Sequence, residues 1–294
     1  MTTLLLGANG QLGRHVRAEI AGLVTCARGQ ADHSLDLTNR DELERLLERV
    51  RPSVIVNAAA WTAVDDAEDH EAEAFRLNHD LPALLADWCR RNDALLVHYS
   101  TDYVFSGSPG RPWREDDAVA PQSAYGRTKL AGEQAIAASA CRALVLRTAW
   151  LYSALPGNFV SAIIGRAGRG EDLKVVADQT GSPTWAGTLA RATRDLLTLS
   201  DRIERPELLH VSGRGAMTWH ELAERAVQLA ARRGIIPGIV GVEPIRSDQW
   251  PQKARRPAWS VLDGSRYERF TGQRLPDVER ALAECLEQWS NAPC

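Results

Sequence analysis

The stretch Thr2-Thr3-Leu4-Leu5-Leu6-Gly7-Ala8-Asn9-Gly10-Gln11-Leu12-Gly13 opens the chain and decides its fold. Its apolar first half is typical of a buried parallel strand, and a helical pattern follows to about Ile20. A glycine turn between strand and helix lets backbone N–H groups approach a pyrophosphate at the positive helix end. The spacing is Gly-x-x-Gly-x-x-Gly, which differs from the Gly-x-Gly-x-x-Gly of many dinucleotide sites. The prediction of a dinucleotide site therefore depends mainly on the position of the turn, after a strand and before a helix. The residues expected to bind a dinucleotide here are Gly7, Asn9, Gly10, Gln11, Leu12 and Gly13.

Apolar runs alternate with helical patterns through the first half of the chain. Further strands are predicted at 23–27, 52–57, 94–100 and 141–148. Helices are predicted at 38–50, at 81–91 and from 125 onward, and the acidic stretch 65–73 leads into another helix that ends near Asn78. This alternation predicts an α/β fold, a Rossmann-like doubly wound parallel sheet with right-handed crossovers.

The rhythm changes after Trp150. Helices are expected at 158–169, 186–198, 218–233 and 278–290, with short strands at 174–176 and 208–211. Thr218 is the expected N-cap of the third of these helices. We interpret residues 1–150 as a dinucleotide-binding domain, to which segments near 185–215 return. Residues 151–294 would otherwise form a smaller C-terminal substrate-binding lobe.

Composition indicates a soluble globular protein, with 294 residues, 44% hydrophobic and 25% charged. A net charge of −3 gives no reason to expect nucleic acid or an anionic membrane as a partner. The first apolar run is too short for a signal peptide or a membrane span. Five scattered cysteines, with no Cys-x-x-Cys pair, predict reduced thiols in a cytoplasmic protein: Cys26, Cys89, Cys141, Cys285 and Cys294.

Tyr125 and Lys129 place a phenol and an ammonium four residues apart in a predicted helix. Residues at i and i+4 share a helical face, so both polar groups can reach one small volume. A lysine beside a tyrosine lowers the phenol pKa, which makes Tyr125 a candidate general acid near neutral pH. On this motif alone, a surface helix without a catalytic role is an equally good interpretation.

Other residues of the first half suggest how a cofactor would bind. Arg28 follows a predicted strand where NAD-preferring sites usually carry an acid, and an arginine there can bind a 2′-phosphate. NADPH is therefore predicted, with NADH and a solvated loop arginine as the alternative. Asp36 and Leu37 come next along the chain and would border the adenine. The small side chains of Ala58, Ala59 and Ala60 would let the backbone pass close to the cofactor, although core packing explains alanines equally well.

Polar residues also end the fourth predicted strand. Ser100, Thr101 and Asp102 stand where a doubly wound sheet binds its ligands, at the carboxyl ends of strands. Residues 106–123 are rich in Gly, Pro and charge, and we interpret them as a loop over that site.

Taken together, these motifs resemble the extended short-chain dehydrogenase/reductase family over nearly the whole chain. The glycine turn and Tyr-x-x-x-Lys are typical of the whole superfamily, whereas residues 101–105 and 178–184 are much more specific. The matching stretches are residues 7–13, 57–65, 100–107, 125–133, 146–150, 178–184 and 256–257, with 260 and 262–263.

The resemblance implies a catalytic set of Thr101, Tyr125 and Lys129. Tyr125 would give a proton to the oxygen of a reduced ketone, Thr101 would hydrogen-bond to that oxygen, and Lys129 would bind the nicotinamide ribose. It also implies that six residues lie near a nucleotide sugar: Val64, Asp65, Asp102, Trp150, Asn158 and Gln179. A structural role is about as good an interpretation for each, such as a core position for Trp150 or a helix cap for Asn158.

The activity implied is the NADPH-dependent reduction of the C4 ketone of dTDP-4-dehydro-6-deoxy-L-mannose to dTDP-L-rhamnose. A dehydratase of this fold usually has Asp-Glu after the threonine, whereas Asp102 is followed here by Tyr103. An epimerase is harder to exclude.

A non-enzymatic relative, the regulatory beta subunit of methionine adenosyltransferase, keeps the fold, but the complete catalytic set favours an enzyme. Arg255 and Arg256 could meet a diphosphate or form a solvated pair.

A metal ion is not expected. Some relatives are described as magnesium-dependent dimers in which a carboxylate early in the first helix contributes to the metal site. This chain has Arg14 and His15 there, and imidazole is a poor ligand for magnesium. The sequence leaves both a monomer and a homodimer open.

Overall fold

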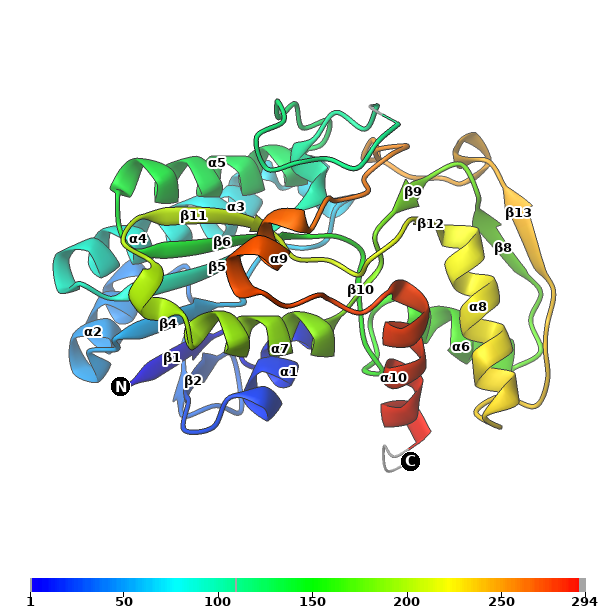
Figure 1. Ribbon diagram of the computed structural model, residues 1–294, viewed down its shortest axis with the longest axis horizontal. Coiled ribbons are helices and arrows are strands. Elements are labelled where there is room, and N and C mark those ends of the chain that lie inside the picture. Colours follow the sequence, from blue (N-terminus) through cyan, green and yellow to red (C-terminus); the bar gives the residue numbers. More distant parts are fainter. Residues whose placement is uncertain (1, 109, 291–294) are drawn as a thin grey trace.

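A seven-stranded sheet runs through the computed structural model, which describes residues 2–108 and 110–290 (Figure 1). Its strands are β1 (Thr3–Leu6), β2 (Val24–Ala27), β3 (His33–Ser34), β4 (Val54–Asn57), β5 (Leu95–Thr101), β6 (Ala143–Thr148) and β11 (Pro206–His210). Their spatial order is β11-β6-β5-β4-β1-β2-β3, and all neighbours are parallel. The direction of winding reverses between β1 and β4, where such sheets bind ligands. The predicted fold class is confirmed.

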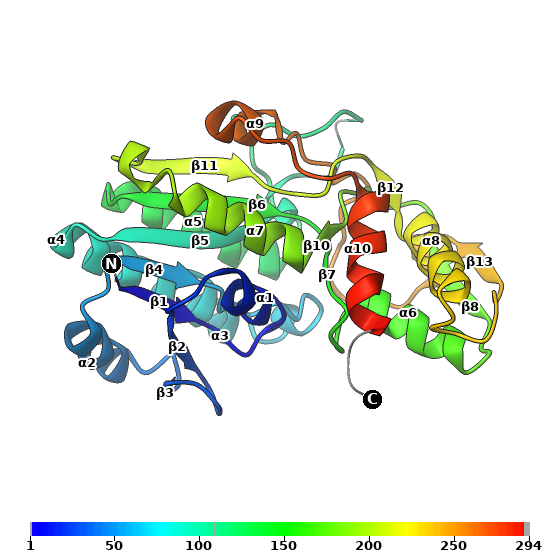
Figure 2. The same cartoon turned by 60° about the horizontal axis from the view of Figure 1, so that its bottom comes forward.

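Helices cover both faces of the sheet because successive strand residues point to opposite sides. Leu5 of β1 lies in the core beneath α1 (Gln11–Glu19) and α7 (Ala186–Leu197), which pack against each other (Figures 1 and 2). Leu4 and Leu6 lie in the opposite core, beneath α2 (Arg40–Val50), α4 (Leu81–Asn92) and α5 (Ala124–Ser139). Burial on both faces explains why these strands are apolar throughout rather than alternating.

Several helices begin at a polar side chain that accepts a hydrogen bond from the first turn. Ser123 caps α5 by accepting from the Gly126 N–H. The predicted N-cap Thr218 is confirmed at the start of α8 (Trp219–Arg232), where Glu221 completes a capping box.

The helices predicted at 65–78 and 81–91 are not separate. The chain runs through η1 (Asp66–Glu68), α3 (Glu71–Phe75) and a π-helical turn, η2 (Arg76–Asp80), directly into α4. Pro82 lies in the first turn of α4, and the wide π turn just before it accommodates the missing proline N–H. The predicted break between the two helices is therefore wrong.

Beyond β6 the chain forms a second, smaller core. It is built by α6 (Phe159–Gly168), α8, β8 (Leu173–Val176) and α10 (Val278–Ser290) (Figure 2). Short pairs join β7 (Leu151–Tyr152) to β10 (Thr184–Trp185), β9 (Thr180–Gly181) to β12 (Met217–Thr218), and β8 to β13 (Val242–Ile245). The remaining elements are η3 (Asp102–Val104), η4 (Ser200–Arg202), η5 (Ser247–Gln249) and α9 (Ser265–Thr271). The boundary at residue 150 stays a prediction.

The cysteines fit the reduced state expected from the sequence. Cys26, Cys89, Cys141 and Cys285 are buried and unbridged, and Cys294 lies outside the described residues. Burial raises the pKa of the Cys26 thiol to about 11. In the described part of the chain, no helix is long and apolar enough to cross a membrane. Nor does that part contain a group of three or more His, Cys, Asp or Glu residues that could hold a metal ion.

Candidate active site

Two adjoining clefts open at the carboxyl ends of the sheet strands. The inner cleft has a volume of about 610 Å³ and lies where β4, β5 and β6 end. The outer cleft, of about 680 Å³, lies beyond the ends of β1 and β2. Both are lined by the same central residues: Gly10, Ala58, Ala59, Ala60 and Thr62. They therefore form one extended depression at the position where doubly wound sheets bind dinucleotides.

The glycine turn leaves its backbone open to the clefts. Gly7 has φ +74, and a Cβ there would lie 2.6 Å from the Ala59 nitrogen, so no other residue fits. A Cβ on Gly13 would lie 2.2 Å from the Gly7 carbonyl oxygen. No side chain caps α1 at Gly10, so the first-turn N–H groups are available to an anion.

The predicted turn residues divide between the two clefts. Gly7, Asn9 and Gly10 line the outer cleft, and Gly10, Gln11 and Leu12 line the inner one. Gly13 lines neither, and its small size serves the packing of α1 against the turn.

The outer cleft also brings together Arg28, Asp36 and Leu37, as the sequence predicted. The Asp36 carboxylate accepts from the N–H and hydroxyl of Thr38, at 2.9 and 2.8 Å, and these bonds lower its pKa. The Arg28 side chain is exposed and forms no ion pair within the described residues. Its guanidinium is thus free to meet a phosphate.

Thr101, Tyr125 and Lys129 all line the inner cleft, although they come from β5 and α5. A Cβ on Gly126 would lie 2.3 Å from the Tyr103 carbonyl oxygen, so glycine allows α5 to approach η3 this closely. That approach brings the phenol of Tyr125 within hydrogen-bonding reach of Thr101.

The expected lowering of the Tyr125 pKa by Lys129 is wrong for this structure. Burial raises the pKa of Tyr125 to about 12, and the hydrogen bond with Thr101 opposes this only in part. Lys129 Nζ instead donates to the Tyr99 carbonyl oxygen at 2.6 Å and lies 3.2 Å from His98 Nε2. Burial lowers the pKa of Lys129 to about 8, because the charged amine is desolvated.

Four of the six residues predicted to lie near the sugar line the inner cleft: Val64, Asp102, Trp150 and Asn158. Asp102 is buried, and this raises its pKa to about 7, although hydrogen bonds with the Ser260 and Thr101 side chains oppose the shift. Trp150 stacks on Trp219 with the ring centroids 3.6 Å apart. Asn158 also caps α6, so the structural alternative for this residue is correct as well.

The other two, Asp65 and Gln179, are not among the cleft-lining residues. Asp65 accepts two hydrogen bonds from Arg256, at 2.8 and 3.2 Å, and others from the N–H groups of Lys253 and Ala254. Gln179 donates to the Ser247 hydroxyl at 2.9 Å. Arg256 itself reaches the inner cleft, so Asp65 orients a cleft residue without lining the cleft.

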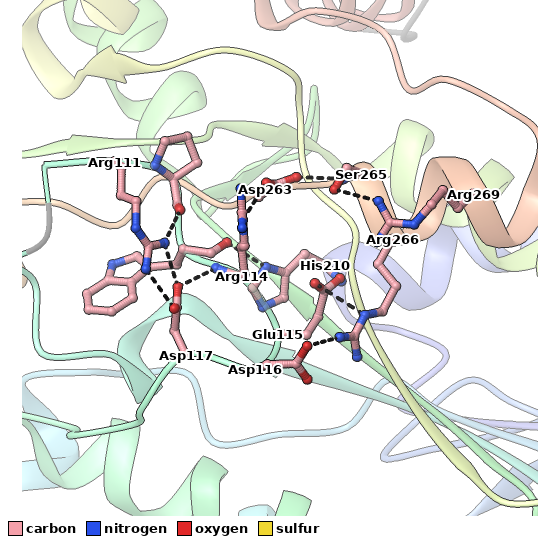
Figure 3. A network of polar contacts seen from close by, with 12 residues as sticks. Arg111, Arg114, Glu115, Asp116, Asp117, His210, Asp263, Ser265, Arg266 and Arg269 are labelled. Carbon is pink, nitrogen blue, oxygen red and sulfur yellow. Dashed lines mark hydrogen bonds and ion pairs between the residues drawn. The ribbon is translucent and has the colours of Figure 1, made fainter.

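The loop of residues 106–123 is fastened by ion pairs (Figure 3). Asp117 accepts two hydrogen bonds from Arg111, at 2.8 and 2.7 Å. Arg266 of α9 pairs with Asp116 and, at 3.6 Å, with the buried Glu115. Glu115 also accepts from the N–H of His210, at the end of β11. The loop is therefore joined to the sheet and to the C-terminal segment.

Comparison with known proteins agrees with this arrangement. A family model described as the RmlD substrate binding domain matches residues 1–291. The chain belongs to this family. The RmlD relatives include the dTDP-4-dehydrorhamnose reductase of Burkholderia thailandensis, which is 38% identical over 297 residues, covering 97% of this chain and 98% of that protein. Another relative is a Streptomyces antibioticus protein named a probable dTDP-4,6-dihydroxy-2-methyloxan-3-one 4-ketoreductase. It is 41% identical over 288 residues, and the match covers 97% of this chain and 95% of that protein.

A solved RmlD-type structure shows the same fold. The dTDP-4-dehydrorhamnose reductase of Bacillus anthracis, in complex with NADP, superposes with a TM-score of 0.88 at 30% identity. The match covers 98% of this chain and 100% of that one. Family and fold thus confirm the resemblance that the motifs suggested.

Sequence reasoning did not single out several residues in and around the inner cleft, among them His98, Asn57 and Trp219. His98 is buried beside Lys129, Asn57 is buried beside His98, and Trp219 stacks on Trp150 from a helix far along the chain. His98 gave a usable signal, since it is the first polar residue after the apolar start of its strand. Neither Asn57 nor Trp219 stands in a pattern that indicates its neighbours.

Proposed function

We propose that this protein reduces the C4 ketone of dTDP-4-dehydrorhamnose to dTDP-L-rhamnose with NADPH. The observation that carries the proposal is the shared lining of the inner cleft by Thr101, Tyr125 and Lys129, next to an uncapped glycine turn. Two relatives of similar length bear the name of that activity, which supports the choice of substrate.

A nicotinamide cofactor, NADPH in this proposal, supplies a hydride to the ketone carbon when bound. Gly7, Asn9 and the first turn of α1 would bind its pyrophosphate through backbone N–H groups. Arg28 would pair with the 2′-phosphate and so favour NADPH over NADH. The other outer-cleft residues, Asp36 and Leu37, would border the adenosine.

Tyr125 acts in this proposal as the proton donor to the ketone oxygen. A pKa of about 12 keeps its phenol protonated at neutral pH, as a donor requires. The Thr101 hydroxyl, which donates to Asp102 Oδ1 at 3.1 Å in this structure, would turn to donate its hydrogen bond to the same oxygen as negative charge develops there. Lys129 would bind the ribose next to the reacting ring and stabilise the phenolate that Tyr125 leaves behind.

The sugar would lie against the remaining residues of the inner cleft. The Asp102 carboxylate, which lines the inner cleft, would accept from a sugar hydroxyl, and Val64, Trp150 and Asn158 would line the nucleotide sugar. Asp65 and Gln179 would act indirectly, the first by orienting Arg256 toward the diphosphate and the second through Ser247.

A second candidate is reduction of a different 4-keto dTDP-sugar. The 41% identity to the Streptomyces antibioticus 4-ketoreductase favours it, because that relative's name gives the same bond chemistry on another sugar. The residues proposed to act on the ketone would have the same roles in either reaction.

A panel assay separates these candidates. NADPH oxidation would be followed with dTDP-4-dehydrorhamnose and with other 4-keto dTDP-sugars, and proton NMR would give the configuration at C4 of each product. We expect the highest kcat/KM with dTDP-4-dehydrorhamnose. A higher kcat/KM with the sugar of the second candidate would show that this sugar, not dTDP-4-dehydrorhamnose, is the substrate. Binding of NADPH without turnover, even at high enzyme concentration, would indicate a binding protein instead.

In this proposal the protein acts in the cytoplasm, as a monomer or a homodimer.

The proposal includes no structural magnesium. The His15 ring packs edge-on against Trp185, at 6.0 Å between centroids, and burial lowers the pKa of His15. An apolar contact of this kind does not suit a ligand of a hard cation. We expect turnover to be unchanged after dialysis against EDTA. A loss that added magnesium restores would contradict this part of the proposal.

A further inference from the structure

A chain of hydrogen bonds inside the sheet ends at Lys129. Asn57 of β4 and His98 of β5 are direct neighbours across the two strands. The Ala59 N–H donates to Asn57 Oδ1 at 3.2 Å, and Asn57 Nδ2 lies 3.2 Å from His98 Nδ1. His98 Nε2 lies 3.2 Å from Lys129 Nζ, which also donates to the Tyr99 carbonyl oxygen. Asn57, His98 and Lys129 are 1%, 0% and 2% exposed, so the chain of hydrogen bonds lies almost wholly inside the protein.

The direction of each bond follows from which atoms carry hydrogen. A backbone N–H only donates, so Asn57 must present its oxygen to Ala59 and its amide nitrogen to His98. The amide nitrogen also only donates, so Nδ1 of His98 is the acceptor. The single proton of the neutral ring is then on Nε2, which faces Lys129.

This arrangement bears on the charge of Lys129. An ammonium group has three donors and no acceptor, so an Nε2–H pointing at it would set donor against donor. A neutral amine has a lone pair that can accept from His98 while the amine donates to Tyr99. A charged Lys129 needs the other tautomer of His98, which requires the Asn57 amide to turn. That turn would leave the Ala59 N–H without its acceptor.

We propose that Asn57 and His98 are positioning residues that set whether the Lys129 amine carries a proton. They act through Lys129 rather than on the ketone, and the inference rests on the role proposed above for that lysine. The Asn57 amide, oriented by Ala59, selects the His98 tautomer. The tautomer in turn stabilises the neutral amine relative to the ammonium, so that Lys129 of the ligand-free protein loses its proton at a lower pH than an exposed lysine.

Most other charged groups around α5 have partners of their own. Burial lowers the pKa of Lys129, and the charge of Glu133 opposes that shift. On α5 itself, Glu133 pairs with Arg147 of β6, Arg127 with Glu71 of α3, and Tyr125 with Thr101. On the elements packed on α5, the pairs are Glu68 with the Ala124 N–H, Asp66 with His70, Asp102 with Thr101, Tyr103 with Arg256, His79 with Asp80, and Arg90 and Arg91 with Asp87. Glu73 of α3 and Arg76 of η2 form no ion pair within the described residues. None of them hydrogen-bonds to Lys129 Nζ, so His98 is the titratable group in direct contact with it.

Nuclear magnetic resonance can test the inference directly, because the sequence contains only Lys129, Lys174 and Lys253 as lysines. Lys174 and Lys253 have exposed side chains and serve as internal references. In ligand-free protein labelled with ¹⁵N at lysine and histidine, we expect His98 as the Nε2–H tautomer above about pH 8, where the Lys129 amine is neutral. We also expect Lys129 to lose its proton at about pH 8, at a lower pH than the two reference lysines. A His98 ring protonated on Nδ1 would overturn the proposal.

Substitutions at Asn57 separate the tautomer effect from simple charge. In Asn57→Asp, the carboxylate accepts from Nδ1–H, so His98 should change tautomer and the Lys129 titration should move up by about one pH unit or more. The uncharged, similarly sized Asn57→Leu no longer fixes the ring. It should therefore move the titration in the same direction by a smaller amount. A shift in Asn57→Asp alone would mean direct attraction by the new charge and would overturn the proposal.

Thr193→Val is the matched control. It removes a buried hydrogen bond to the Tyr99 hydroxyl, at 2.8 Å, that does not involve Lys129. We expect it to leave both the tautomer and the titration unchanged, whereas a shift like that of the Asn57 variants would assign the effect to general loosening of β5. The alkaline limb of kcat/KM should follow the NMR titration in each variant. Since the NMR measurement needs neither cofactor nor substrate, its failure would defeat this inference and leave the proposed function standing.

Discussion

Tyr125 is the residue on which the proposed chemistry depends. Its phenol lies in the inner cleft with Thr101, and the structure keeps it protonated. Tyr125→Phe keeps the ring and removes only the proton donor. We expect kcat to fall by about 10²–10⁴-fold, the usual contribution of a general acid, with NADPH affinity largely kept. Steady-state kinetics and a fluorescence titration with NADPH would check both parts. Turnover near the wild-type rate would remove Tyr125 as the acid.

Arg28 is the residue that should distinguish the two cofactors. Its exposed guanidinium has no ion-pair partner in the described chain, so it is available to a 2′-phosphate. Because hydrogen bonds to charged groups contribute about 1.5–3 kcal/mol, Arg28→Ala should weaken NADPH binding by about tenfold or more and NADH binding far less. Calorimetric titration with both cofactors measures the difference. Arg40→Ala, which breaks an exposed pair with Glu44, is the matched control and should change neither affinity. Equal losses for the two cofactors in Arg28→Ala would defeat the assignment.

At the scale of elements, the position of α5 against the sheet matters most, because this helix carries two of the proposed catalytic residues. Glu133 of α5 accepts two hydrogen bonds from Arg147 of β6, at 2.8 and 2.6 Å. Both side chains are buried, at 8% and 4% exposure, and the guanidinium lies 5.0 Å from the Phe105 ring centroid. The pair therefore joins the helix to the strand inside the protein.

Breaking this buried pair should be costly. Glu133→Ala leaves the Arg147 guanidinium buried and unpaired, so we expect the free energy of unfolding to fall by about 3–5 kcal/mol. The exposed pair between Arg127 of α5 and Glu71 of α3 offers a control, and Glu71→Ala should cost at most about 1 kcal/mol. Urea unfolding of the two variants measures both. Similar losses of unfolding free energy in the two variants would contradict the claim that burial makes the Glu133–Arg147 pair the more important one.

The elements also show where sequence reasoning succeeds and where it stops. Long apolar runs such as residues 94–100 predicted the strands, because parallel strands are buried on both faces. The π-helical turn at Arg76–Asp80 has no local signature, and β13 contains a proline and exposed residues that no strand pattern indicates. Such features depend on neighbours distant in the sequence.

At the scale of the whole molecule, the same limit applies to the site. The glycine turn, Thr101 and the Tyr125–Lys129 pair were predictable, because each is a local motif whose place in a doubly wound sheet is known. The partners of Lys129 were not, since His98 reaches it from a strand about 30 residues away in sequence. The expected direct effect of Lys129 on the Tyr125 pKa was wrong for the same reason: helical spacing does not reveal that another strand supplies the hydrogen bonds of the lysine.

Whole-molecule stability should depend on pH through the buried His210, which Figure 3 shows within the loop network. Burial, aided by the charge of Arg147, lowers the pKa of His210 from 6.5 to about 3. Below pH 6.5 the unfolded chain therefore binds a proton that the folded protein does not. This contribution to stability is complete above pH 6.5 and decreases by about 1.4 kcal/mol per pH unit as the pH falls toward 3.

His210→Asn removes that titration. The urea midpoint of the variant should fall less steeply than that of the wild type as the pH is lowered from 6.5, where the unfolded imidazole begins to gain its proton. Part of the slope should persist, because burial also lowers the pKa of His98. Parallel slopes for the two proteins would contradict the assignment.

The central claim is that the inner cleft transfers a hydride to C4 of the sugar while Tyr125 supplies the proton. A single turnover with NADPH deuterated at its transferable position, followed by proton NMR of the product, tests it most directly. The account predicts dTDP-L-rhamnose with deuterium at C4, formed by the wild type and almost absent with Tyr125→Phe. An unlabelled product, deuterium at another carbon, or equal yield from the variant would contradict it.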